Sequence, residues 1–165
     1  MKHFNTLYQA NYAMVHGLVT RMVGDGDAVK DLVQEVFVKL YLQLQAGERI
    51  EYPKTWLYRV ATHGAINHLS RTRKHLAMEE AMHVSEKAGA EQLLERSDRK
   101  RQIDRALMKL EERDRLLLVL YADGLSYREM AEIGSIGLSS VGKLLSRAIQ
   151  KFKKIAQDEG IDVFE

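Results

Sequence analysis

The sequence predicts an all-α protein built from two small helical domains joined by a linker. Apolar residues recur at three- and four-residue steps in almost every long segment, which is the period of an amphipathic helix. Alternating β-branched residues are scarce, and Pro53 is the single proline. The charge is also uneven, at +4 for residues 1–75, −4 for 76–98 and +4 for 125–154. We therefore expect domains at 1–75 and 99–157, an acidic linker at 76–98 and an acidic tail at 158–165.

The N-terminal domain is predicted to contain three helices. The first runs from about Phe4 to Val23 and is broken by the Gly-Asp-Gly-Asp sequence at 24–27, where an Asp is a good N-cap for the next helix. The second runs from about Ala28 to Gln45 and carries a wide apolar stripe. The third opens near Pro53, a residue suited to a first helical turn, and continues to about Arg73 with a basic end. The linker is rich in Ala, Glu and Met, so part of it could be helical.

The C-terminal domain is predicted to end in a helix-turn-helix. A helix from Asp98 to about Leu110 precedes an apolar run at 116–121. Ser126 and Glu129 have the spacing of a capping box for a short helix over 127–133. A Gly-containing turn at 134–137 follows, and Ser139 or Ser140 is expected to open the last helix. A last helix that a short preceding helix holds at a fixed angle can enter a DNA major groove, and its cations contact phosphates.

Composition excludes several other classes of protein. The 165 residues include no Cys, which removes disulfides and thiolate metal sites and fits a reducing cytoplasm. No apolar run approaches the roughly 20 residues that cross a bilayer, so no membrane insertion is expected. His63 and His68 are five residues apart, which is not the spacing of a helical zinc site, and the other His residues form no cluster. We expect no metal, no cofactor and no enzymatic activity.

Both halves of the chain carry motifs of one known family. Residues 31–37 (DLVQEVF) resemble the polymerase-binding signature of extracytoplasmic-function (ECF) sigma factors, and 54–61 (KTWLYRVA) resemble their promoter-melting segment. Residues 106–110, 124–131 (GLSYREMA), 140–141 and 146–148 resemble the C-terminal sigma domain. The similarity covers about residues 4–73 and 98–154, with the same order and spacing.

The resemblance implies a transcription initiation factor that binds the two largest subunits of bacterial core RNA polymerase and promoter DNA. Such proteins are cytoplasmic and are commonly controlled by an anti-sigma factor, which can hold them at the membrane. Aromatic side chains beside cations, as at Trp56 and Tyr58, suit stacking on unpaired bases, although Trp56 alone is more typical of a core residue. The implied polymerase-binding residues are Asp31, Gln34, Glu35 and Lys39; the minus-ten residues are Lys54, Trp56, Tyr58, Arg59, His63, Asn67, Arg71 and Arg73; and the minus-thirty-five residues are Arg128, Ser139, Ser140, Lys143, Arg147 and Lys151.

Some positions depart from the family pattern, and two alternatives remain open. His63 and Gly64 stand where many relatives carry Asn and a better helix former, which puts the minus-ten preference in doubt. Gly142 and Leu144 replace common cations of the recognition helix, and Ser135 replaces a turn Gly, so a weak or unusual minus-thirty-five contact is expected. A helix-turn-helix regulator that acts without polymerase, or a helical interaction decoy, would also explain the C-terminal half.

Overall fold

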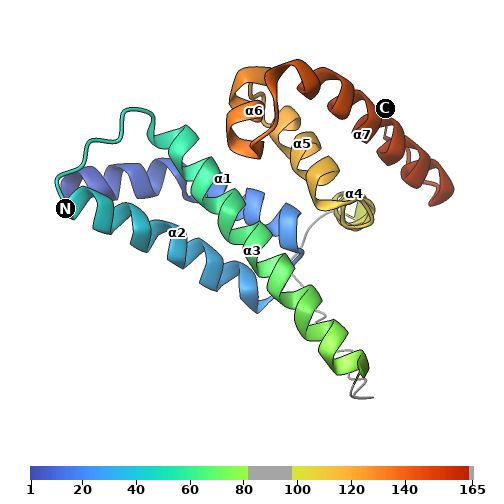
Figure 1. The fold of residues 1–165 in the computed structure, drawn as a ribbon, viewed down its shortest axis with the longest axis horizontal. Coiled ribbons are helices and arrows are strands. Elements are labelled where there is room, and N and C mark those ends of the chain that lie inside the picture. The colour runs from blue at the N-terminus through green and yellow to red at the C-terminus, as the bar shows by residue number, and fades with distance from the viewer. Residues whose placement is uncertain (82–97, 164–165) are drawn as a thin grey trace.

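The computed structural model describes residues 1–81 and 98–163, and within these ranges it contains seven α-helices and no strand. The N-terminal unit comprises α1 (Lys2–Val23), α2 (Asp27–Gln45) and α3 (Pro53–Ala81). The C-terminal unit comprises α4 (Asp98–Met108), α5 (Glu112–Ala122), α6 (Tyr127–Gly134) and α7 (Leu138–Asp158). The predicted all-α class is therefore confirmed, and Figure 1 shows the two units side by side, with the end of α3 projecting beyond both.

The three N-terminal helices form a bundle because each buries one apolar stripe. Val15, Leu18 and Met22 of α1 pack where the stripes of α2 and α3 meet, and all three are fully buried. α2 contributes a run of buried residues at three- and four-residue steps from Val29 to Leu40, as its sequence predicts. The opposite face of α2 is exposed, and it carries charged and amide side chains together with the exposed apolar residues Val38 and Leu42.

The C-terminal unit is built around α5. Leu116, Leu117 and Leu120 of α5 are buried, and α6 and α7 both pack against this helix. The predicted capping box is present: the Ser126 hydroxyl accepts a hydrogen bond from the Glu129 N–H at 3.2 Å, and the Glu129 carboxylate accepts one from the Ser126 N–H at 2.7 Å. These bonds satisfy two N–H groups that an uncapped helix leaves free, which fixes the start of α6.

The predicted turn between α6 and α7 is present, with its left-handed residue at Ser135 rather than at a glycine. Ser135 has φ 52°, and the Ile136 N–H donates to the Ala131 carbonyl at 2.9 Å, which closes the end of α6. The prediction that Ser139 or Ser140 opens the last helix is wrong. α7 begins at Leu138 after Gly137, with no side-chain cap, because the preceding turn already sets the direction of the chain.

Two other boundaries also differ from expectation. No Asp caps α2: its N-cap is Gly26, whose carbonyl accepts from the Val29 N–H at 3.2 Å, and Asp27 lies in the first turn instead. The favourable interaction of an acidic side chain with the positive end of the helix still applies there. α3 continues eight residues past the predicted end near Arg73, into the predicted linker, whose sequence after Arg73 is rich in helix formers. The remainder of that linker, 82–97, and residues 164–165 of the acidic tail lie outside the described residues.

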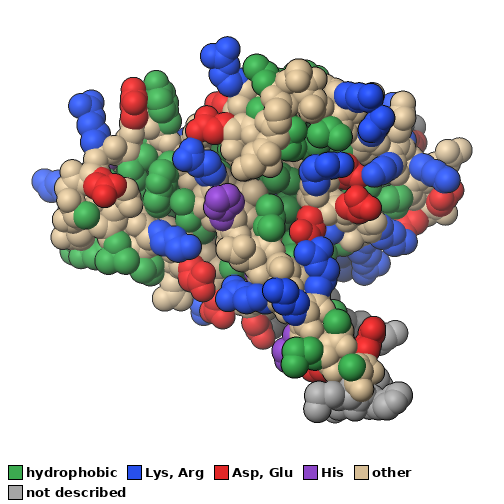
Figure 2. All heavy atoms as spheres, viewed as in Figure 1, with side chains coloured by type: hydrophobic (Ala, Val, Ile, Leu, Met, Phe, Trp, Pro, Cys, Tyr) green, Lys and Arg blue, Asp and Glu red, His purple; other side chains and the backbone are tan. Residues whose placement is uncertain are grey.

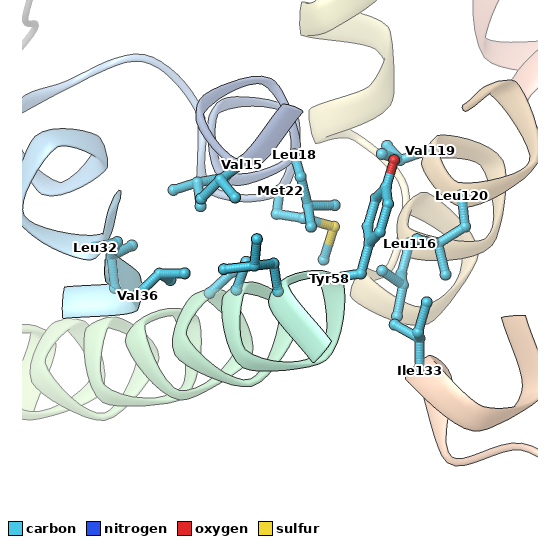
Figure 3. Close-up of a cluster of buried hydrophobic side chains, with 14 of the residues drawn as sticks. Val15, Leu18, Met22, Leu32, Val36, Tyr58, Leu116, Val119, Leu120 and Ile133 are labelled. Carbon is cyan, nitrogen blue, oxygen red and sulfur yellow. The ribbon is translucent and has the colours of Figure 1, made fainter. Parts of the chain in front are cut away.

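The two units share one continuous hydrophobic core. Leu18 and Met22 of α1 and Tyr58 of α3 lie against Leu116 and Leu120 of α5, and the same cluster extends to α6. Figure 3 shows the Tyr58 ring pointing from α3 toward α5 between these side chains. A second, smaller cluster joins α4 to the end of α7 through Ala106, Ala156 and Ile161. The units are therefore packed together rather than tethered apart.

Replacing Gly64 with Ala is expected to stabilise the fold. A Cβ at this position of α3 would lie 3.8 Å from Leu32 Cδ2, which is an ordinary van der Waals contact. Because Gly is about 0.8–1 kcal/mol less favourable than Ala inside a helix, Gly64→Ala should raise the free energy of unfolding by about 0.5–1 kcal/mol. Urea unfolding followed by circular dichroism measures this change.

The matched control for that prediction is Gly24→Ala. Gly24 follows α1 with φ +86°, where an L side chain is strained, so the same Gly-to-Ala change should destabilise the protein there. If Gly64→Ala instead lowered the free energy of unfolding, α3 would require a residue without a side chain at this position.

Candidate nucleic-acid and polymerase interfaces

The last helix presents one buried face and one exposed polar face. Val141, Leu145 and Ala148 are buried against α5 and α6. The predicted minus-thirty-five residues of α7 recur at three- and four-residue steps, so they form a single stripe on the opposite side. All are exposed, and they are Ser139, Ser140, Lys143, Arg147 and Lys151. Arg128, the remaining predicted residue, is exposed on α6.

Lys151 has a structural contact as well as an exposed position. Its Nζ lies 2.5 Å from Asp114 Oδ2, and the Asp114 side chain is only 2% exposed. The ammonium therefore neutralises a buried carboxylate and ties α7 to α5, while about half of the Lys151 side chain remains accessible. Arg147 and Lys143 lie one and two turns nearer the start of α7, where a helix-turn-helix meets the bases.

At positions 142 and 144 of the recognition helix the sequence departs from the family pattern, but neither departure takes a cation out of the exposed stripe. Leu144 is half-buried and packs against the hydrophobic core. Gly142 faces Tyr127, because a Cβ there would lie 3.4 Å from Tyr127 Cε2. Both positions therefore flank the buried face of α7, and the residue types present there do not by themselves indicate weak DNA contact.

A second basic surface lies along one side of α3. Arg59, His63, Asn67 and Arg71 are spaced four residues apart, so they lie along one side of this helix. The last three are exposed, and Arg59 is about half-exposed. Figure 2 shows Lys and Arg side chains distributed along α3 and again over α7, on one face of the molecule. The two helices that carry the predicted DNA-binding residues are therefore both basic on this face.

The other predicted minus-ten residues lie in different environments. Lys54 is exposed at the start of α3, and Trp56 is partly buried against the hydrophobic core. Tyr58 is only 2% exposed, and its hydroxyl donates to Asp123 Oδ2 at 2.9 Å. Burial, followed by that hydrogen bond, raises the pKa of Tyr58 above its usual range. Arg73 is exposed and pairs with Glu112 at 2.6 Å.

The sequence did not single out the residues that hold Tyr58 in place. Asp123 directly follows α5, and its carboxylate also accepts two hydrogen bonds from Arg21 Nη2, at 3.0 and 3.1 Å. Arg21 lies 102 residues away along the chain, so no local pattern connects the two. In the sequence, the only indication was that Arg21 and Asp123 are both charged residues close to the end of a helix.

The predicted polymerase-binding residues occupy the exposed edge of α2. Asp31, Gln34, Glu35 and Lys39 are all exposed. Beside them lies an open groove of about 470 Å³ between α1 and α2, whose lining includes Gln34 and is largely aromatic. The ring centroids of Tyr8 and Phe37 are 4.6 Å apart in this groove, and the lining rings are Phe4, Tyr8, Tyr12, Phe37 and Tyr41. Sequence reasoning missed this groove, because its residues come from two separate segments.

Among the described residues, no helix combines the length and apolarity that crossing a membrane requires. In the same parts of the chain, no three His, Cys, Asp or Glu side chains come together as metal ligands would. The fold and its surfaces thus define a class: a helical protein with a helix-turn-helix and a second basic helix for nucleic acid.

Comparisons with known proteins identify the family within that class. Residues 7–75 match the profile of Sigma-70 region 2, and residues 100–152 match that of Sigma-70 region 4. The chain is 31% identical to RNA polymerase sigma factor YlaC of Bacillus subtilis (strain 168), over 93% of this chain and 94% of the relative. It is 32% identical to the ECF RNA polymerase sigma-E factor of Escherichia coli (strain K12), over 89% of this chain and 83% of the relative.

The fold has a solved counterpart as well. The sigma factor RpoE of Bartonella quintana, in a complex with the anti-sigma factor NepR, superposes with a TM-score of 0.75 at 18% identity. The match covers 95% of this chain and 98% of that one. The chain belongs to the ECF sigma factors, the alternative sigma factors that bind core RNA polymerase and direct it to specific promoters. The resemblance read from the sequence is confirmed.

Proposed function

We propose that the exposed edge of α2 binds the clamp helices of the largest polymerase subunit. Asp31, Gln34 and Glu35 make this edge polar and partly acidic, which suits a basic coiled coil. The neighbouring aromatic groove adds apolar area next to these charges. An acidic edge steers association, and the apolar groove supplies the buried area that holds a complex together.

The stripe on α3 is proposed to capture the melted minus-ten strand. Arg59, Arg71 and Arg73 supply positive charge for phosphates, while Trp56 and Tyr58 are the aromatic residues of this segment. Stacking in duplex DNA averages about 1.4 kcal/mol per base-pair step, so several trapped bases can offset local strand separation. This activity is binding, so the proposal assigns no catalytic residue to the chain.

The C-terminal unit is proposed to bind the flap of the other large polymerase subunit and to read the minus-thirty-five element. The observation that carries this proposal is the single exposed stripe on α7, in which Lys143 and Arg147 follow two serines at the start of a helix held by a capped α6. Serine hydroxyls reach base edges and cations reach phosphates, so one face combines both kinds of contact.

Control by an anti-sigma factor is proposed from the family. The Bartonella quintana relative was solved in a complex with NepR, and its fold matches nearly the whole of this chain. We place the protein in the bacterial cytoplasm, where core polymerase and promoter DNA are found. An anti-sigma factor could hold it at the membrane without any insertion of this chain.

Lys143→Ala is expected to weaken promoter binding by the holoenzyme about fivefold to tenfold. A lost phosphate or base contact costs on the order of 1–1.4 kcal/mol, and the slope of affinity against salt should fall by about one. Competition binding on a promoter mapped by run-off transcription measures both quantities. Lys154→Ala is the matched control: the same change on the same helix, at an exposed position three turns further from the start, should alter affinity less than about twofold. Equal effects of the two changes would refute the assigned stripe.

A further inference from the structure

Asp114 is a buried carboxylate that the proposed function leaves unused. It lies in the first turn of α5 and is only 1% exposed, and among the described residues it is the only acidic one in the buried interior. A carboxylate withdrawn from water is unfavourable unless an opposite charge or a set of hydrogen-bond donors compensates it. The positive end of the α5 dipole supplies part of that compensation. A cation from another element is therefore expected beside it.

The cation comes from the recognition helix, α7, which lies against α5 (Figure 1). Lys151 Nζ lies 2.5 Å from Asp114 Oδ2, and the two residues are 37 apart in the chain. The buried face of α7 consists of apolar side chains such as Val141, Leu145 and Ala148. Apolar packing is non-directional, whereas a hydrogen-bonded ion pair has a defined geometry. The pair therefore limits how far α7 can rotate about its own axis on the surface of α5.

The position of Lys151 argues against a direct contact with DNA. It lies about 20 Å along α7 from Leu138, whereas the recognition helix of a helix-turn-helix contacts base edges with its N-terminal residues. Its ammonium would also have to leave Asp114 in order to bind a phosphate, and the buried carboxylate would then lose its partner. Ser140 and Lys143 lie in the first two turns of α7 instead, where base contacts are made.

We propose that Asp114 is a positioning residue for minus-thirty-five recognition: it holds Lys151, and this pair sets the rotation of α7 at which Ser140 and Lys143 meet the bases. Lys151 itself binds no phosphate. The inference rests on the proposed reading of the minus-thirty-five element by α7. Hydrogen bonds to base edges require donor–acceptor distances of about 2.7–3.2 Å, whereas attraction to phosphates acts over about 10 Å. A small rotation of the helix therefore lowers sequence discrimination much more than it lowers general DNA affinity.

The test uses the full-length protein in the holoenzyme, with variants of both partners. Asp114→Asn keeps the side-chain size and leaves no unpaired carboxylate, Lys151→Gln removes the cation, and the double variant removes both charges. Lys151→Arg is the conservative variant, because a guanidinium can still pair with Asp114. Lys154→Gln is the matched control, because it removes an exposed cation from the same helix. Thermal unfolding establishes that each variant is folded.

The main measurement is a discrimination ratio, obtained by competition binding. It is the affinity for a promoter mapped by run-off transcription, divided by the affinity for the same promoter with its minus-thirty-five element scrambled. We expect Asp114→Asn and Lys151→Gln each to lower the ratio about five- to tenfold, and the double variant to lower it no further, because both changes remove one shared interaction. Lys151→Arg and Lys154→Gln should keep the ratio within about twofold of the parent.

The slope of affinity against salt separates positioning from direct contact. The slope should not change in Lys151→Gln, whereas loss of a phosphate contact would lower it by about 0.9. A lower slope with an unchanged ratio would overturn the proposal and make Lys151 a phosphate contact. A folded Asp114→Asn protein that keeps the full ratio would also overturn it, because the pair would then serve stability alone. If the parent holoenzyme does not distinguish the two promoters, the proposed reading of the minus-thirty-five element is itself wrong, and the inference falls with it.

Discussion

Replacing Arg115 with Ala is expected to lower the free energy of unfolding by about 3–5 kcal/mol, the range for removing one partner from a buried polar network. Arg115 is 5% exposed, and its guanidinium donates to four backbone carbonyls. Three belong to the end of α4 and the turn after it: Leu107 at 3.0 Å, Met108 at 3.3 Å and Leu110 at 2.9 Å. The fourth is the carbonyl of Met22, in the last turn of α1.

The size of this effect follows from what the deletion leaves behind. Carbonyls at a helix C-terminus have no partner within the helix, and a cation there also interacts favourably with the helix dipole. Burial lowers the pKa of Arg115, with Glu112 acting in the opposite direction, but an arginine stays charged in a protein. Ala would therefore leave up to four carbonyls without their donor and would open a cavity between the two units.

Urea unfolding, compared with that of Arg113→Ala, tests the Arg115 prediction. Arg113 is exposed on the same helix, so its loss should change stability by less than about 0.5 kcal/mol. Arg115→Lys should fall between the two, because an ammonium keeps the charge but cannot reproduce the planar fork. A loss below about 1 kcal/mol for Arg115→Ala would show that water replaces the guanidinium at little cost.

Reversing the charge of Asp31 and Glu35 together is expected to weaken binding to core RNA polymerase by about 10- to 100-fold, which is about 1.4–2.7 kcal/mol. The two residues are four apart on α2, so both project from the same exposed edge. Like charge facing a basic partner costs affinity, while neither side chain supports the hydrophobic core. Titration of labelled protein with core polymerase at two salt concentrations measures the change.

Glu48→Lys with Glu51→Lys is the matched control for that experiment. These residues are exposed between α2 and α3, so the double change alters the net charge of the same unit by the same amount at a different place. It should affect polymerase binding only about twofold or threefold, and mainly at low salt, where long-range attraction is strongest. Equal effects of the two double variants would indicate a general charge effect and remove the α2 edge from the proposed interface.

Features set by neighbouring residues could be predicted from the sequence. The apolar stripe of α2 and the Ser126–Glu129 capping box depend on spacings of three and four residues, and both are present as expected. Helix boundaries differ from the prediction where two sequence signals compete. An Asp next to Gly26 suggested a side-chain cap, but Gly26 itself occupies the N-cap position and Asp27 lies in the first turn. The end of α3 was placed too early because its basic residues resemble a C-terminal turn, although good helix formers continue the helix.

Contacts between the two units could not be predicted, because they join residues far apart in the chain. The Tyr58–Asp123 and Arg59–Glu132 bonds span 65 and 73 residues. Aromatic and basic residues around Tyr58 suggested an exposed nucleic-acid surface, and the pattern that indicates such a surface does not indicate what covers it. The local sequence likewise does not distinguish Arg115 from the other charged residues of α5, because the carbonyls it binds come together only when α1 packs against α4 and α5.

Co-elution with core RNA polymerase from Bacillus subtilis or Escherichia coli on a sizing column, at moderate salt, tests the central claim most directly. We expect a stable one-to-one complex that initiates transcription at specific promoters and that the Asp31–Glu35 double variant fails to form. A folded protein that elutes apart from both polymerases, yet still binds duplex DNA, would contradict a polymerase-dependent function. It would instead indicate a helix-turn-helix regulator that works without polymerase.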